Sequence, residues 1–169
     1  MRKTILETKR LKMVTTLDSD ILFLYHKLFA NDEVCRFTFG ERLSLEESKA
    51  FMKKYFNYNG IFDFSPIIEK STDKVIGYGG IFPFDYYNKD NQYEFGYAFE
   101  RDVWGLGYAT EIAIGQIEFI QKNFPNSKIM ATAHPKNSAS KRVLEKVGME
   151  LFEPSIIMGK RGLRDIYSL

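Results

Sequence analysis

The spacing of apolar and polar residues predicts an alternation of strands and helices along the chain. Aromatic residues at every second position of 92–99 predict a half-buried strand. Apolar residues three or four positions apart, from Ala109 to Ile120, predict an amphipathic helix after it. The same patterns predict further strands at 10–13, 61–70, 74–84, 128–133, 149–158 and 163–169, and further helices at 19–29, 44–56 and 137–147.

Two of the predicted helices carry end signals in the sequence. Ser44 followed three residues later by Glu47 forms a capping box at the start of one. Asn137 is the predicted N-cap of another, and Gly148 is the residue that ends it. The full order is one strand, two helices, three strands, a helix, a strand, a helix and two strands. This mixture is typical of an α+β fold with a mixed sheet.

Length, charge and cysteine content limit the classes of protein. With 169 residues and no repeat or Pro-, Gly- or Ser-rich linker, we expect a single domain over 1–169. Lys and Arg number 24 and Asp and Glu 22, a balance that argues against a nucleic-acid partner. Cys35 is the lone cysteine, and the histidines lack ligand spacing to it, so neither a disulfide nor a metal site is expected. No signal segment or run of about 18 apolar residues occurs, which predicts a cytoplasmic protein without a membrane partner.

A glycine turn lies between the strand 92–99 and the helix that follows it. Gly105 and Gly107 allow positive φ and a close approach of backbone to an anion, and the helix start offers unpaired N–H groups. Together these features suit a pyrophosphate, although two glycines also serve simply to turn a chain. A dinucleotide fingerprint is excluded because Thr110 occupies the place of its third glycine, and no Walker A loop is present.

The residues of this turn resemble the motif of the GNAT acyl-CoA N-acyltransferases, Arg/Gln-x-x-Gly-x-Gly/Ala between a strand and a helix. The match is at Gly107 and Ala109, with Trp104 in the Arg/Gln position. The longer string Trp-Gly-x-Gly-Tyr-Ala-Thr-Glu is similar to the RimJ/RimL-like branch, whose members acetylate protein N-termini or small amines. Four further segments resemble that branch in the same order, namely 6–11, 94–97, 137–149 and 165–169.

The resemblance implies a three-layer fold. Its mixed central sheet would have six or seven strands, helices on both faces, and a splay between the fourth and fifth strands. It also implies acetyl-CoA as the acyl donor, with pyrophosphate on the turn amides and pantetheine at the splayed strand edge. The residues expected to contact acetyl-CoA are Phe99, Trp104, Gly105, Leu106, Gly107, Tyr108, Ala109, Thr110, Asn137, Ser140, Lys141 and Arg142. A plain helix cap for Asn137, and a solvated helix face for Lys141 and Arg142, remain alternatives.

Acetyl transfer requires an amine to lose a proton and a thiolate to leave. An alkylammonium of pKa ~10 is largely unreactive at neutral pH, so a carboxylate is needed nearby. Glu94 is the one acidic residue in an aromatic strand, and we predict it as the general base; a place on a solvent face or a pair with a lysine is the alternative. Many family members supply a tyrosine seven residues after the asparagine, where this chain has Leu144. The branch that the chain resembles often has a serine near the asparagine instead, which implies that Ser140 donates a hydrogen bond to the sulfur, unless it is merely a polar helix residue.

Four other polar residues are predicted to have no part in the chemistry. Asp102 and Glu111 flank the glycine turn, where a pyrophosphate would repel them, so they are expected in solvent or favoured by the helix dipole. Cys35 is expected to pack, and His134 to be structural or on the surface, with a place at the acceptor entrance as its alternative.

The acceptor site is predicted from the aromatic content, 15% of the chain. Much of it falls on strand 92–99, and the rest gathers near 37–39 and 82–87, where the resemblance places the acceptor. We predict substrate contacts from Phe37, Phe39, Phe84 and Tyr86, with Asp85 attracting an ammonium group; packing is the alternative. The acceptor is then a small amine or a protein N-terminus, and the chain a monomer or homodimer. A non-catalytic CoA-binding sensor is the alternative function, suggested by Leu144.

Overall fold

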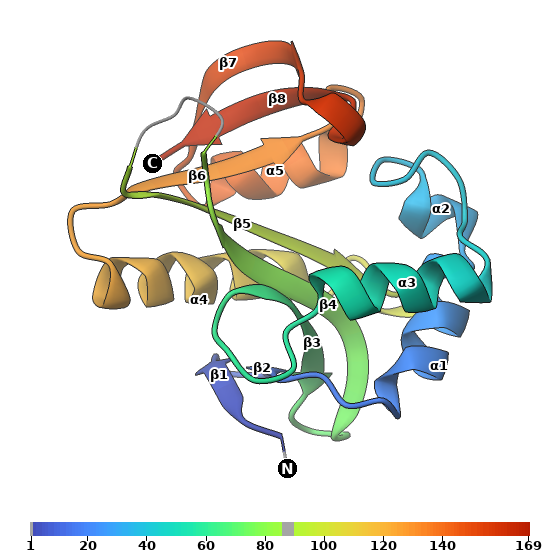
Figure 1. Cartoon of the computed structure of the whole chain (residues 1–169). Coiled ribbons are helices and arrows are strands. Elements are labelled where there is room, and N and C mark those ends of the chain that lie inside the picture. Colours follow the sequence, from blue (N-terminus) through green and yellow to red (C-terminus); the bar gives the residue numbers. More distant parts are fainter. Residues whose placement is uncertain (1, 86–89) are drawn as a thin grey trace.

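A computed structural model describes residues 2–85 and 90–169, and its named strands form one mixed sheet (Figure 1). The strands lie in the order β1-β2-β3-β4-β5-β6-β8-β7. Their bounds are β1 (Thr4–Glu7), β2 (Leu11–Val14), β3 (Asp63–Glu69), β4 (Lys74–Pro83), β5 (Gln92–Phe99), β6 (Lys128–Ala133), β7 (Glu150–Ile157) and β8 (Leu163–Ser168). Neighbours are antiparallel except β5 and β6, which are parallel.

Helices cover both faces of this sheet, which confirms the α+β, three-layer prediction (Figure 1). The helical segments are α1 (Asp20–Leu24), a π-helical turn (Tyr25–Phe29), α2 (Asp32–Cys35), α3 (Leu45–Tyr55), a 3₁₀ turn (Arg101–Val103), α4 (Tyr108–Asn123), α5 (Ser138–Lys146) and a second 3₁₀ turn (Gly159–Arg161). The core on one face contains α4 and α5, and the core on the other contains α1 and α3. None of the helices in the described ranges combines the length and apolar character needed to cross a membrane.

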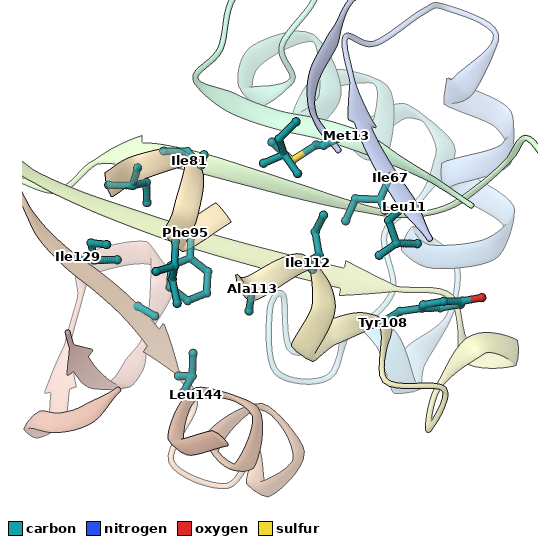
Figure 2. Close-up of a cluster of buried hydrophobic side chains, with 14 of the residues drawn as sticks. Leu11, Met13, Ile67, Ile81, Phe95, Tyr108, Ile112, Ala113, Ile129 and Leu144 are labelled. Carbon is teal, nitrogen blue, oxygen red and sulfur yellow. The ribbon is translucent and has the colours of Figure 1, made fainter. Parts of the chain in front are cut away.

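The predicted apolar stripe of α4 forms the centre of the larger core. Ile112, Ala113 and Ile120 are fully buried, and Figure 2 shows the first two among side chains of the sheet such as Leu11 and Ile67. Burial of each large aliphatic side chain contributes about 1.5–3 kcal/mol. This packing holds the N-terminus of α4 at the end of β5, where the glycine turn lies.

A cluster of aromatic rings fills the opposite face and takes up much of the aromatic excess. Phe29 lies 5.7 Å from Phe51 and 5.4 Å from Tyr78, measured between ring centroids. Phe64 in turn lies 5.1 Å from Tyr78, and Phe56 packs against the same rings. The sequence analysis had assigned the aromatic excess to β5 and the acceptor region. That was incomplete, because these rings come from α3, β3, β4 and the segments beside them.

The sheet opens between β5 and β6, as the resemblance implied. These strands pair only through Gln92 with Lys128, Tyr93 with Ile129, and Glu94 with Met130. Beyond that point β5 continues to Phe99 along β4, whereas β6 pairs with β8 instead. The second half of β5 therefore has an edge without a neighbouring strand at the predicted splay.

Three features differ from the predicted elements. The sheet has eight strands rather than six or seven, because β1 pairs with β2 although its sequence pattern is mixed. The predicted helix 19–29 divides into α1 and a π-helical turn, and the short α2 follows with Asn31 as its side-chain cap. The capping box of α3 is confirmed, with the Ser44 amide donating to the Glu47 carboxylate at 2.8 Å.

Candidate active site

A cavity of about 820 Å³ opens at the splay between β5 and β6. Its lining combines the predicted acceptor residues Phe37, Phe39 and Phe84 with the predicted catalytic residues Glu94 and Ser140. Tyr86, the fourth predicted acceptor residue, lies outside the described residues. Residues far apart in the sequence are thus gathered around one space large enough for a small molecule.

The aromatic acceptor residues also serve the core, as their alternative interpretation proposed. The Phe39 ring centroid lies 5.0 Å from that of Phe51, within the aromatic cluster described above. Phe84 is buried in a small cluster with Met130 and Ile166. Phe37 instead stacks on His134 at 5.2 Å, and both line the cavity. A role in packing and a place in the cavity wall are therefore compatible for these residues, because one wall of the cavity is the surface of the core.

Glu94 is 7% exposed and faces the cavity from the middle of β5. Arg161 donates to both of its carboxylate oxygens, at 2.8 Å from Nη1 and 2.5 Å from Nη2. Thr132 Oγ1 donates a third hydrogen bond at 2.8 Å, and itself accepts from Arg161 at 2.7 Å. The carboxylate is therefore held in one orientation and does not lie on a solvent face. Its pair with Arg161 resembles the other alternative, a pair with a lysine, with arginine as the cation.

Arg161 is a site residue that the sequence analysis missed. It lies in the 3₁₀ turn between β7 and β8, which was predicted only as a connection. Burial disfavours its charge, but the hydrogen bond and the charge of Glu94 outweigh burial and raise the pKa of Arg161. In the sequence, Arg161 is marked only as a cation in a hairpin loop between Gly159 and Gly162. That position does not indicate that its partner, Glu94, lies 67 residues away.

The glycine turn has the backbone conformation that its sequence predicts. Gly105 and Gly107 both have a φ of 80°, in the left-handed region that favours glycine. Gly107 is the N-cap of α4 and offers no side-chain hydrogen bond to the helix. The first amides of α4 therefore have no side-chain cap, and such amides are suitable donors to an anion.

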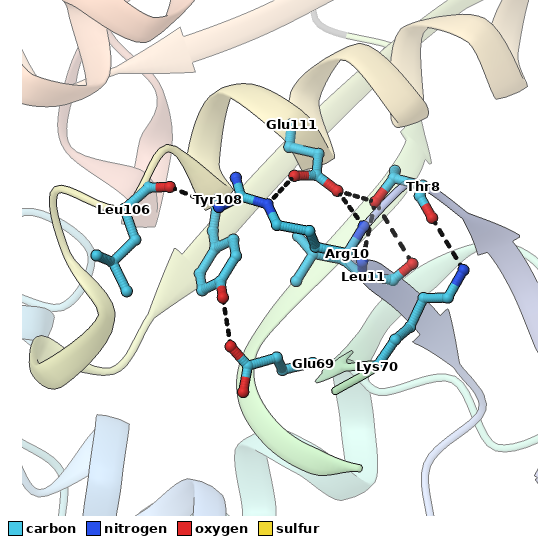
Figure 3. Close-up of polar contacts among 8 residues, drawn as sticks. All are labelled: Thr8, Arg10, Leu11, Glu69, Lys70, Leu106, Tyr108 and Glu111. Atoms are coloured by element: carbon cyan, nitrogen blue, oxygen red, sulfur yellow. Dashed lines mark hydrogen bonds and ion pairs between the residues drawn. The ribbon is translucent and has the colours of Figure 1, made fainter. Parts of the chain in front are cut away.

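Polar contacts attach this turn to the first two strands (Figure 3). Arg10 Nη1 donates to the Leu106 carbonyl at 2.9 Å, and its guanidinium lies 4.3 Å from the Tyr108 ring centroid. Glu111 accepts hydrogen bonds from Thr8 Oγ1, the Arg10 amide and Arg10 Nε, each at 2.6 Å. Tyr108 donates to Glu69. The turn is therefore held from one side by the connection between β1 and β2 and by the end of β3.

The expectation that Glu111 lies in solvent was wrong, although it does occupy the first turn of α4. Burial opposes its charge, but the hydrogen bonds from Thr8 and Arg10 together outweigh burial and lower the pKa of Glu111. Asp102 is exposed as predicted, and pairs with Lys27 at 2.9 Å. Trp104, also exposed, donates its ring N–H to the Phe99 carbonyl at 2.8 Å, so it closes the end of β5.

Helix α5 forms another wall of the cavity. The Asn137 side-chain oxygen Oδ1 accepts from the Ser140 amide at 3.1 Å, so its predicted cap role is confirmed while the residue also lines the cavity. Lys141, predicted to contact phosphate, forms an ion pair with Asp165 at 2.9 Å. Arg142 is exposed on the same helix. Of the two cations, therefore, only Arg142 has no ion pair within the described residues.

Tyr97 is a second missed residue, close to Ser140. Its ring lines the cavity from β5, and its hydroxyl is buried without a normal hydrogen bond among the described residues. Burial raises the pKa of Tyr97 to about 12, an effect that the nearby Ser140 partly offsets. Leu144, at the position of the family tyrosine, is buried in the core. The cavity therefore holds a tyrosine hydroxyl, but on a strand instead of the helix.

Cys35 and His134 are the other two residues that were predicted to have no part in the chemistry. Cys35 is buried, and burial raises the pKa of its thiol to about 11, as suits a packing residue. His134 lines the cavity, and its Nδ1 accepts from the Lys136 amide at 3.1 Å. Burial and the neighbouring Arg164 lower the pKa of His134. Its alternative placement at the acceptor cavity is therefore the one observed.

The sequence of the chain matches a known family over most of its length. Residues 10–150 match the family described as the acetyltransferase (GNAT) domain. The chain belongs to the GNAT acetyltransferase family. This confirms the family and the enzyme class predicted from the glycine turn, that of the acetyl-CoA-dependent N-acetyltransferases, and GNAT proteins use acetyl-CoA as the acyl donor.

Individual GNAT proteins resemble this chain to different extents. An uncharacterised N-acetyltransferase of Bacillus subtilis (strain 168), YnaD, is 34% identical over 104 residues, which are 62% of this chain and 58% of that protein. The match thus spans less than two thirds of YnaD. A GNAT-family acetyltransferase structure from Bacillus anthracis has a TM-score of 0.80 and 22% identity, covering 99% of this chain and 98% of the other.

A spermidine N-acetyltransferase from Vibrio cholerae, solved with CoA and spermine, has the same GNAT fold. Its TM-score is 0.73 at 14% identity, with 95% of each chain covered. At these identities the two structural likenesses establish the fold alone. They leave the acceptor of this GNAT protein to be argued from its own cavity.

Proposed function

We propose that the chain transfers an acetyl group from acetyl-CoA directly to a primary amine bound in the cavity at the splay. The observation that carries this proposal is the position of Glu94. It is a buried carboxylate that lines the same cavity as Asn137 and Ser140, next to the unpaired edge of β5. The edge, the left-handed glycines and the uncapped start of α4 suit pantetheine and pyrophosphate.

Glu94 acts as the general base in this proposal. It takes the proton of the ammonium directly or through a water, while Thr132 and Arg161 keep its oxygens oriented. The amine nitrogen then forms its bond to the acetyl carbon as the carbon–sulfur bond breaks. Ser140 donates a hydrogen bond to the departing sulfur, which takes up the released proton. A thiol of pKa roughly 8.5 needs no strong acid for this step.

The string at 104–111 supports placing the chain in the RimJ/RimL-like branch. Its acceptor is then a small amine or a protein N-terminus, as in that branch. Contacts from Lys141 to phosphate require the ion pair with Asp165 to open, so we expect Arg142 and the turn amides to contribute more.

The test is release of free thiol from acetyl-CoA in the presence of amines of several classes: amino acids, peptides with a free N-terminus, polyamines and aminoglycosides. We expect turnover with at least one class. Tight binding of acetyl-CoA without turnover of any amine would contradict catalysis.

The second candidate is a CoA-binding sensor without catalysis. Two observations favour it: Leu144 replaces the family tyrosine, and Arg161 occupies both oxygens of Glu94. The variant Glu94→Gln distinguishes the candidates, because an enzyme loses kcat/KM whereas a sensor only has to retain its affinity for CoA.

A further inference from the structure

The cavity contains a buried arginine, Arg164, that acetyl transfer itself does not require. It is 8% exposed and points from β8 into the cavity. Nη1 donates to the Leu163 carbonyl at 2.7 Å, and Nη2 donates to the Phe37 carbonyl at 3.0 Å. A guanidinium has five N–H donors, so these two hydrogen bonds leave most of its donors free for another partner.

Arg164 also lacks a counter-ion within the described part of the chain. Glu94, the buried carboxylate that lines the same cavity, forms its ion pair with Arg161. Asp165, next to Arg164 in sequence, pairs with Lys141 instead. Burial and the charge of Arg161 lower the pKa of Arg164, and the charge of Glu94 offsets this only in part. Buried charges in proteins are normally paired, so an unpaired one beside an open cavity indicates an anionic ligand.

We propose that the acceptor is a small amine that also carries a carboxylate, bound through that carboxylate to Arg164 with its amine towards Glu94. Arginine binds carboxylates through two parallel N–H bonds, which fixes the orientation of the bound group as well as its charge. The apolar walls of Phe37 and Phe84 suit the body of such a molecule. This inference depends on the proposed function, since it identifies the substrate class of the same site.

The same charges disfavour a polyamine. A second ammonium group entering the cavity would meet Arg161 and Arg164. Among the lining carboxylates, the buried Glu94 is already paired with Arg161, and Asp85, predicted to attract an ammonium group, is exposed, so its attraction is screened by water. A binding site discriminates against a ligand when like charges are brought together there without water between them. The spermidine enzyme that shares this fold therefore need not share its acceptor class.

The experiment compares matched amines that differ in the carboxylate. The pairs are phenylalanine with phenethylamine, and γ-aminobutyrate with butylamine, each tested for kcat/KM with the full chain. We expect at least a tenfold preference for the carboxylate-bearing member of one pair. Arg164→Gln should abolish that preference mainly through KM, Arg164→Lys should retain part of it, and the exposed Arg42→Gln, with the same charge change, should leave it intact.

A binding measurement does not depend on turnover. 3-Phenylpropanoate, which has the carboxylate but no amine, should raise the melting temperature of the wild type and not that of Arg164→Gln; 3-phenylpropanol should shift neither. Equal or faster acetylation of the plain amines would overturn the inference and leave the proposed function standing. Absence of turnover with every amine would instead contradict the proposed function, and the melting shift would still decide whether Arg164 binds carboxylates.

Discussion

The cofactor turn is built mainly from backbone, whereas the acceptor cavity is built from side chains. The turn depends on two residues with a φ of 80° and on amides within one stretch of chain, Gly105–Thr110. The cavity depends on the pair of Glu94 with Arg161 and on Arg164, which come from three separate strands and loops. A backbone site therefore tolerates most side-chain changes, but a side-chain site can acquire a new acceptor through one or two substitutions.

The largest effect on activity is expected in the acceptor cavity, the part of the site that is built from side chains. Glu94→Gln should lower kcat/KM by about 10²–10³-fold, because an amide cannot take the ammonium proton. The affinity for CoA, measured by calorimetry, should change less than twofold. Glu145→Gln, exposed on α5, is the matched control. Thermal unfolding checks that the unpaired Arg161 has not disrupted the fold, and an unchanged kcat/KM in a folded variant would exclude Glu94 as the base.

A change in the backbone half should show the opposite pattern. Gly107→Ala places a side chain at a left-handed φ, which costs about 1 kcal/mol. It should also weaken CoA binding about tenfold, the cost of a displaced hydrogen bond. Gly148→Ala carries the same strain, at a φ of 89°, at the end of α5. It should lower stability equally without affecting CoA affinity; equal losses of affinity in both variants would refute a local role for the turn.

A smaller effect is expected where the two halves meet. Ser140→Ala removes one predicted hydrogen bond to the sulfur, worth about 1 kcal/mol, and should lower kcat about fivefold without changing CoA affinity. Ser138→Ala, at an exposed position two residues earlier, is the control. If kcat is unaffected by Ser140→Ala and falls in Tyr97→Phe, the buried hydroxyl of Tyr97 is the donor instead.

The smallest effect concerns the attachment of the turn to β1 and β2. The pKa of Glu111 is lowered in the folded protein, so it stabilises the fold above its unfolded pKa of roughly 4.3, and this contribution is lost as the pH falls through its folded pKa. Glu111→Gln should cost about 0.5 kcal/mol at pH 7, or one to two degrees in Tm. The difference should vanish in acid. The exposed Glu118→Gln should show neither effect.

Elements that are specified by residues close together in the sequence were predicted correctly. The strand at β5, the capping box at Ser44 and the stripe on α4 are local patterns, and each was found in the structure. The strand β1 was not predicted, because its pairing with β2 outweighs a weak pattern of its own. The placement of Phe37, Phe39, Phe84, Glu94 and Ser140 in one cavity followed from the family resemblance, not from periodicity.

The sequence alone determined the family, through motifs spread along the chain. It also determined the glycine turn and its positive φ, which depend on residues within one short segment. Only the tertiary structure decided that Glu94 pairs with Arg161 and that Glu111 is held by Thr8 and Arg10. The same holds for Arg164, which has no counter-ion among the residues that the structure describes. The physical reason is distance along the chain. A buried charge is stabilised by whichever group the fold brings within hydrogen-bond reach, and no local pattern contains that information.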